Sequence, residues 1–158
     1  MKLLPQEYYH LPLDQAKSAA FDIVQIKRHG QWCILIVEPN GHFTLNNAND
    51  INIRSGETFP TNCGTYIGVF DLVCQNLWLF DCWWRDQIDL RGTGYKERYS
   101  QLFMVSTKLP KFCMVVPCFR PQNIDQIWGI VQTQKDDGLI FRRLQETAFD
   151  RVAFTKNL

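Results

Sequence analysis

Short apolar runs separated by polar turns dominate the first half of the chain and predict β-strands. Five such runs lie at residues 21–26, 32–37, 42–45, 66–74 and 77–84. Asn40-Gly41, between the second and third runs, indicates a hairpin, because this pair favours the backbone angles of a tight turn. The last run is apolar at every position except Asp81, which is typical of a strand buried on both faces. We therefore predict an antiparallel meander over the first three runs, followed by two more strands.

Two later segments carry apolar side chains at helical spacing. Tyr95, Tyr99 and Leu102 lie on one side of a helix predicted at residues 95–105. A second predicted helix has Asn123 as its N-cap and an apolar stripe made of Ile124, Ile127, Trp128 and Val131.

The remaining segments complete a mixed pattern. Strands are predicted at residues 112–119, 139–141 and 152–154, and residues 46–64 are polar enough to predict a loop. Residues 1–20 predict a loop and a short helix capped by Asp14. The order of elements indicates an α+β fold with mostly antiparallel sheets and flanking helices.

Composition narrows the class of protein. The chain has 158 residues, of which 46% are hydrophobic, and a formal net charge of +1, so we expect a core of ordinary size and no binding of nucleic acid by bulk charge. No apolar run approaches the length of a membrane span, and no signal peptide is evident. Six scattered cysteines suggest free thiols in a reducing compartment. We expect a cytoplasmic protein, in the host cytosol if it is viral, with no membrane partner.

Lys27 stands out among the polar residues. It closes an apolar run and is separated by two residues from Gly30, where a strand passes into a turn. Reactive side chains are often held at such points, on loops carried by a rigid sheet. Taken alone, the same residues are also compatible with a solvated Lys-Arg pair beside a turn.

Further motifs connect Lys27 with a known family. They are Leu79-Phe80-Asp81, Tyr95-Lys96-Glu97-Arg98-Tyr99, Asp137-Gly138-Leu139-Ile140-Phe141 and Phe154-Thr155-Lys156. With Lys27-Arg28-His29-Gly30 they resemble, in order, the motifs of the covalent nucleotidyltransferases: ATP-dependent DNA ligases, RNA ligases and mRNA capping guanylyltransferases. The resemblance implies an ATP-grasp-like core of the ligase and capping-enzyme type. Because the sequence ends at Leu158, we expect residues 1–158 to form a single minimal domain that lacks an OB domain.

In this family a lysine amine attacks the α-phosphate of ATP or GTP, forms a lysyl-nucleotide and releases pyrophosphate. The amine must lose its proton first, although the pKa of a free lysine is about 10.4. The resemblance implies that Lys27 is the nucleophile, that Asp137 is the carboxylate on the metal or phosphate side, and that Lys156 contacts phosphate. Arg142 replaces a lysine of the family and keeps its charge, so it joins the nucleotide-binding candidates.

Other residues are candidates for stacking on the nucleotide base and for binding the metal ion. Trp78 and Phe80 share one strand face by alternation, so either can stack on the base. The resemblance implies Mg²⁺ or Mn²⁺ as cofactor, held by carboxylates. Val69 stands where the family has a glutamate, and Asp71 follows on the same strand face, so we assign the metal to Asp137 and Asp71.

Departures from the motifs leave alternatives open. His29 and Val69 replace acidic residues of the family. A catalytically inactive module that binds nucleotide, cap or nucleic acid is one alternative to an active nucleotidyltransferase, and a structural subunit with a vestigial cleft is another. The expected partners are a nucleotide and a nucleic-acid end, with a separate protein subunit as a possible source of the missing domain.

Overall fold

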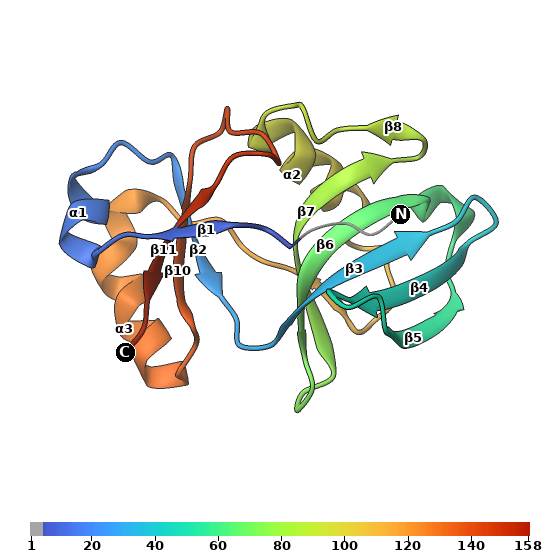
Figure 1. Cartoon of the computed structure of the whole chain (residues 1–158), viewed down its shortest axis with the longest axis horizontal. Coiled ribbons are helices and arrows are strands. Elements are labelled where there is room, and N and C mark those ends of the chain that lie inside the picture. The colour runs from blue at the N-terminus through green and yellow to red at the C-terminus, as the bar shows by residue number, and fades with distance from the viewer. Residues whose placement is uncertain (1–4) are drawn as a thin grey trace.

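The computed structural model describes residues 5–158, which form two β-sheets with helices packed against them (Figure 1). The smaller sheet has the strand order β1-β11-β10-β2, made of β1 (Tyr8–His10), β11 (Val152–Lys156), β10 (Gly138–Arg142) and β2 (Ile23–Lys27). Pairing is antiparallel except between β1 and β11. The first four residues of the predicted lead-in segment lie outside the described residues.

The larger sheet has the order β5-β4-β3-β6-β7-β8, and β9 adds to β7 in parallel. Its strands are β3 (Gln31–Val37), β4 (His42–Asn47), β5 (Asn52–Glu57), β6 (Gly64–Asp71), β7 (Asn76–Arg85), β8 (Ile88–Asp89) and β9 (Cys113–Val115). The helices are α1 (Leu13–Ser18), α2 (Tyr95–Val105) and α3 (Ile124–Gln134), with short 3₁₀ turns at Pro60–Asn62 and Pro121–Asn123. None of the helices in residues 5–158 is long and apolar enough to cross a membrane.

Each sheet has a helix-covered face. In the smaller sheet, alternation along β10 turns Leu139 and Phe141 toward α3, whose Ile127 and Val131 are buried against them. In the larger sheet, one face packs with α2 and buries a separate apolar cluster. The other face carries Phe80 and further aromatic side chains, and it adjoins the smaller sheet. The two sheets therefore present opposing surfaces to a space between them.

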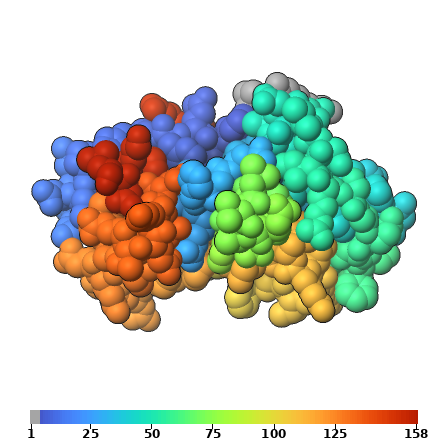
Figure 2. All heavy atoms as spheres, turned by 90° about the horizontal axis from the view of Figure 1, so that it is seen from below, coloured from blue at the N-terminus to red at the C-terminus, as the bar shows by residue number. Residues whose placement is uncertain are grey.

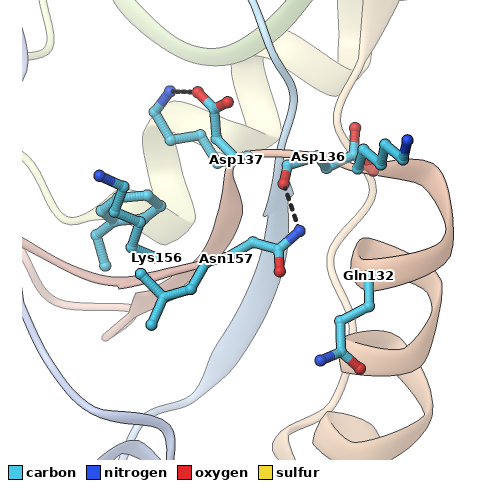
Figure 3. A pocket seen from close by; sticks show the side chains of 9 residues that line it. Gln132, Asp136, Asp137, Lys156 and Asn157 are labelled. Atoms are coloured by element: carbon cyan, nitrogen blue, oxygen red, sulfur yellow. Dashed lines mark hydrogen bonds and ion pairs between the residues drawn. The ribbon is translucent and has the colours of Figure 1, made fainter.

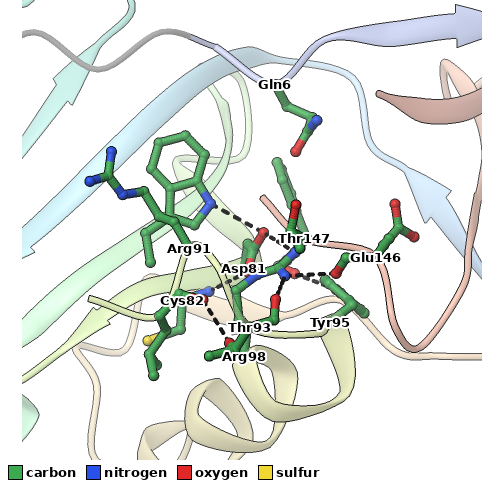
Figure 4. Close-up of polar contacts among 12 residues, drawn as sticks. Gln6, Asp81, Cys82, Arg91, Thr93, Tyr95, Arg98, Glu146 and Thr147 are labelled. Atoms are coloured by element: carbon green, nitrogen blue, oxygen red, sulfur yellow. Dashed lines mark hydrogen bonds and ion pairs between the residues drawn. The ribbon is translucent and has the colours of Figure 1, made fainter. Parts of the chain in front are cut away.

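A fully buried ion pair ties α2 to β7 (Figure 4). Arg98 Nε lies 2.8 Å from Asp81 Oδ1, Arg98 Nη2 lies 3.2 Å from Oδ2, and neither side chain is exposed. The remaining acceptor capacity of Asp81 is used by the indole N–H of Trp83 and the backbone N–H of Cys82. Such complete hydrogen bonding allows two charges to be held in a low-dielectric interior.

The fold class predicted from the sequence is confirmed, but several local expectations were wrong. Residues 52–57, predicted as loop, form β5, an edge strand that pairs only with β4 and needs no apolar face to do so. The strand expected at 112–119 is confined to β9. Pro12, not Asp14, occupies the N-cap of α1; Asn123 does occupy the N-cap of α3, although its side chain makes no capping hydrogen bond.

The Asp81–Arg98 pair gives a prediction about stability. We expect Asp81→Asn to destabilise the fold by about 3–5 kcal/mol, because it leaves a buried guanidinium without its counter-charge. Asp89→Asn is the matched control: Asp89 also pairs with an arginine, Arg91, but its side chain is 46% exposed. That change should cost less than about 1 kcal/mol. Urea unfolding of the three proteins measures both values, and equal losses would show that the buried pair has no special role.

Candidate functional site

Three neighbouring strands align Lys27, Gly138 and Lys156. In the register of the smaller sheet, Gly138 of β10 pairs with Lys27 of β2 on one side and with Lys156 of β11 on the other. Gly138 has φ +154°, and a Cβ added there would lie 2.0 Å from the carbonyl oxygen of Thr155. Only glycine fits this position without a backbone shift. The two lysines therefore flank a residue with no side chain.

Both lysines line a cavity of about 640 Å³ at the end of the smaller sheet (Figure 3). The other lining residues come from the end of α3, the turn after it and the end of β11: Gln132, Lys135, Asp136, Asp137, Phe154, Asn157 and Leu158. Lys135 ends α3 in a left-handed conformation with φ 59°, which turns the chain sharply and brings the two aspartates to the mouth of the cavity.

Asp137 holds the amine of Lys27. Its Oδ2 lies 2.8 Å from Lys27 Nζ, and its Oδ1 accepts a hydrogen bond of 3.0 Å from His29 Nδ1. The Lys27 side chain is 17% exposed, so the amine is accessible from the cavity but largely screened from bulk water. Burial favours the neutral acid, but hydrogen bonds from Lys27 and then His29 outweigh it and lower the pKa of Asp137. The carboxylate is therefore ionised near neutral pH.

The cavity carries uncompensated positive charge. Asp137 pairs with Lys27, and Asp136 pairs with Arg28, with Arg28 Nη1 3.3 Å from Asp136 Oδ2. Lys135 and Lys156 also line the cavity, and within residues 5–158 neither forms an ion pair. Such an excess of cations suits an anionic ligand such as a phosphate chain.

The two candidates for base stacking face the space between the sheets. Trp78 and Phe80 line a narrow cavity next to Lys27, together with Gln25, Arg28, Val69 and other apolar residues. Its volume is only about 10 Å³. Phe80 is buried, and the guanidinium of Arg28 lies 4.4 Å from the centre of the Trp78 ring. The alternation predicted for these two residues therefore places them beside Lys27, in a space that is almost filled. Figure 2 shows the blue segment between β2 and β3 at the surface, flanked by the orange α3 region and the green β6–β7 hairpin.

Two other sequence candidates do not line either of these cavities. Arg142 is fully buried, donates from Nε to Gln25 Oε1 at 2.8 Å and stacks 4.1 Å from the Tyr95 ring. Asp71 ends β6, and its Oδ1 accepts the backbone N–H groups of Val73 and Cys74, which lower its pKa. Asp71 thus stabilises its own turn, whereas the buried Nη1 and Nη2 of Arg142 have no hydrogen-bond partner within the described residues.

The acidic residues beside the cavity offer few ligands for a metal ion. In residues 5–158 no three His, Cys, Asp or Glu side chains gather into a metal-binding group. Asp137 is a single carboxylate already shared by Lys27 and His29. Because Mg²⁺ is often bound by one or two carboxylates plus substrate phosphates, this donor set suits an ion that arrives with a phosphate ligand.

Sequence reasoning did not single out Lys135 or Asp136 as parts of the site, and it named Arg28 only as the basic neighbour of Lys27. The signal available in the sequence was a pattern of complementary charges: Lys27-Arg28 at the end of one strand and Asp136-Asp137 before the next.

Comparisons with solved structures define the class of fold. The chain resembles mycobacterial DNA ligase D complexed with ATP, with TM-score 0.74 and 14% identity over 98% of this chain and 60% of that one. It resembles a Lig E DNA ligase with TM-score 0.68 and 13% identity, over 99% of this chain and 69% of the other. Chlorella virus DNA ligase-adenylate gives TM-score 0.61 and 11% identity, over 98% and 68%.

The protein therefore shares the fold of these DNA ligases, which is the fold that the resemblance of its sequence motifs implied. Comparison of the sequence with protein-family models and with curated proteins finds no match.

The register around Gly138 can be tested by adding one methyl group. We expect Gly138→Ala to destabilise the protein and to separate Lys156 from Lys27, because the Cβ cannot fit against the Thr155 carbonyl. Gly129→Ala is the control, since a Cβ on this α3 residue meets nothing within 4 Å. An alanine inside a helix should stabilise by roughly 0.5–1 kcal/mol. Thermal unfolding distinguishes the two, and similar melting temperatures would contradict the steric account.

Proposed function

We propose that the protein is a nucleotidyltransferase that forms a lysyl-nucleotide on Lys27 and passes the nucleotide to a nucleic-acid end. The observation that carries the proposal is the position of the Lys27 amine. It lies 2.8 Å from an ionised aspartate and lines a cavity that also holds Lys135 and Lys156. An accessible amine beside a cation-rich cavity is the arrangement that this chemistry requires.

The chain's own groups account for the first step. Lys27 Nζ attacks the α-phosphorus of a nucleoside triphosphate, an N–P bond forms, the bond to the pyrophosphate oxygen breaks, and pyrophosphate leaves. Asp137 is in place to accept the proton that the amine loses, because it is already hydrogen bonded to Nζ. Lys156 and Lys135 stabilise the charge of the phosphate chain. A bound Mg²⁺ or Mn²⁺, held by Asp137 and the phosphates, would supply further charge neutralisation.

ATP is the favoured nucleotide, and a DNA end the favoured acceptor. Support comes from the likeness to DNA ligases, one of which is complexed with ATP while another is described as an adenylate. The chain spans 60% of the length of the mycobacterial ligase.

Two observations favour an inactive binding module as the second candidate. The space beside Trp78 is nearly closed, and His29 and Val69 replace acidic residues of the family motifs. Such a module would bind nucleotide or nucleic acid without forming a covalent bond.

Intact-protein mass spectrometry separates the two functions. After incubation with each ribonucleoside triphosphate and Mg²⁺ or Mn²⁺, we expect a gain of one nucleoside monophosphate, strongest with ATP and absent in Lys27→Ala. Lys156→Ala should slow the gain on the order of 100-fold, through loss of one charge-stabilising group.

Lys17→Ala is the matched lysine control. Lys17 lies on α1 and pairs with Asp125 of α3, and it does not line the cavity. This variant should form the adduct at the wild-type rate. Folded wild-type protein that gains no mass with any nucleotide would reject the covalent function and favour the binding module.

A further inference from the structure

We propose that Arg28 is a gate on the base side of the nucleotide cleft: its guanidinium occupies the face of Trp78 that a nucleobase would use, and nucleotide binding must displace it. The inference rests on the proposed function, because it assumes that the space between the sheets beside Lys27 receives the base.

The contacts of Arg28 show how it closes this space. The residue follows Lys27 directly, at the end of β2. Its guanidinium lies 4.4 Å from the centre of the Trp78 ring, while Nη1 lies 3.0 Å from Gln134 Oε1 and 3.3 Å from Asp136 Oδ2. Arg28 thus links the end of α3 in one layer to β7 in the other, across the mouth of the cleft.

The remaining volume confirms that the cleft is shut on this side. About 10 Å³ is left among Arg28, Trp78, Phe80 and their neighbours, which is roughly the room that a single water needs. Ligand pockets usually have about 300–1,000 Å³. The cavity of about 640 Å³ on the other side of Lys27 is lined mainly by charged and polar residues, so it suits phosphates better than a base.

Two features favour movement of the Arg28 side chain away from Trp78. Its side chain is 22% exposed, and its buried Nε has no hydrogen-bond partner within the described residues. A buried donor without a partner is unfavourable, so movement into solvent would satisfy this group. A guanidinium and a nucleobase both stack on an aromatic face, so the two compete for one surface of Trp78.

Equilibrium binding tests the gate without relying on catalysis. The test uses a Lys27→Ala background, which cannot form the covalent adduct. In this background Arg28→Ala should bind ATP about fivefold to tenfold more tightly, because no guanidinium has to be displaced from Trp78. Binding of inorganic tripolyphosphate, which has no base, should not tighten. Trp78→Ala should abolish the gain.

Arg54→Ala in the same background is the matched control. Arg54 stacks on an aromatic ring in the same manner, 4.2 Å from the centre of Phe112, but it lines neither cavity. Its loss should leave both affinities unchanged. Arg28→Lys keeps the charge and stacks less well, so it should raise the affinity for ATP by less than Arg28→Ala does. This variant replaces Arg28→Ala in the test if the alanine variant does not fold.

The outcomes separate the gate from the proposed function. If ATP binds and the loss of Arg28 leaves its affinity unchanged or weakens it, the gate is wrong and the nucleotide site stands. Weaker binding of both ATP and tripolyphosphate would identify Arg28 as a phosphate ligand instead. If neither ATP nor GTP binds with or without Arg28, the cleft is not a nucleotide site, and both proposals fall.

Discussion

The register of three strands around Gly138 is the constraint on which the candidate site depends. Because no side chain fits against the Thr155 carbonyl, β10 and β11 can approach closely only with glycine at this position. The pairing then sets Lys27 and Lys156 on either side of it. Asp137, one residue before Gly138, is fixed by the same register, since its backbone N–H donates to the carbonyl of Lys27. The Lys27 amine, the Asp137 carboxylate and the Lys156 amine are thus positioned by backbone geometry.

Electrostatics completes this arrangement. Two basic residues at the end of β2 face two acidic residues before β10. Lys27 forms an ion pair with Asp137 and Arg28 with Asp136, so the charges of these four residues cancel. The lysines without partners, Lys135 and Lys156, leave the adjacent cavity cationic. The Arg28–Asp136 pair has a second consequence, because it holds the guanidinium over Trp78 and closes the space between the sheets. The short segment Lys27-Arg28 therefore places an amine in the cationic cavity and a guanidinium over Trp78.

The sequence predicted the α+β class and placed Lys27, Asp137 and Lys156 in the motifs that the fold brings together at one cavity, since strand patterns and turn residues are local signals. It did not predict β5, because an edge strand lacks the apolar alternation that identifies a strand. It also grouped Arg142 with the nucleotide ligands, although that side chain is buried on Tyr95. Alternation gives the face on which a residue lies, but which groups meet across two sheets depends on tertiary packing.

The most direct measurement is localisation of the bound nucleotide by tandem mass spectrometry of peptides from ATP-treated protein. The account predicts an adenylate on Lys27. Attachment to Lys135, Lys156 or the neighbouring His29, each of which can also form a phosphorus–nitrogen bond, would contradict the assignment of the nucleophile. It would show that the register around Gly138 presents a different group to the phosphate.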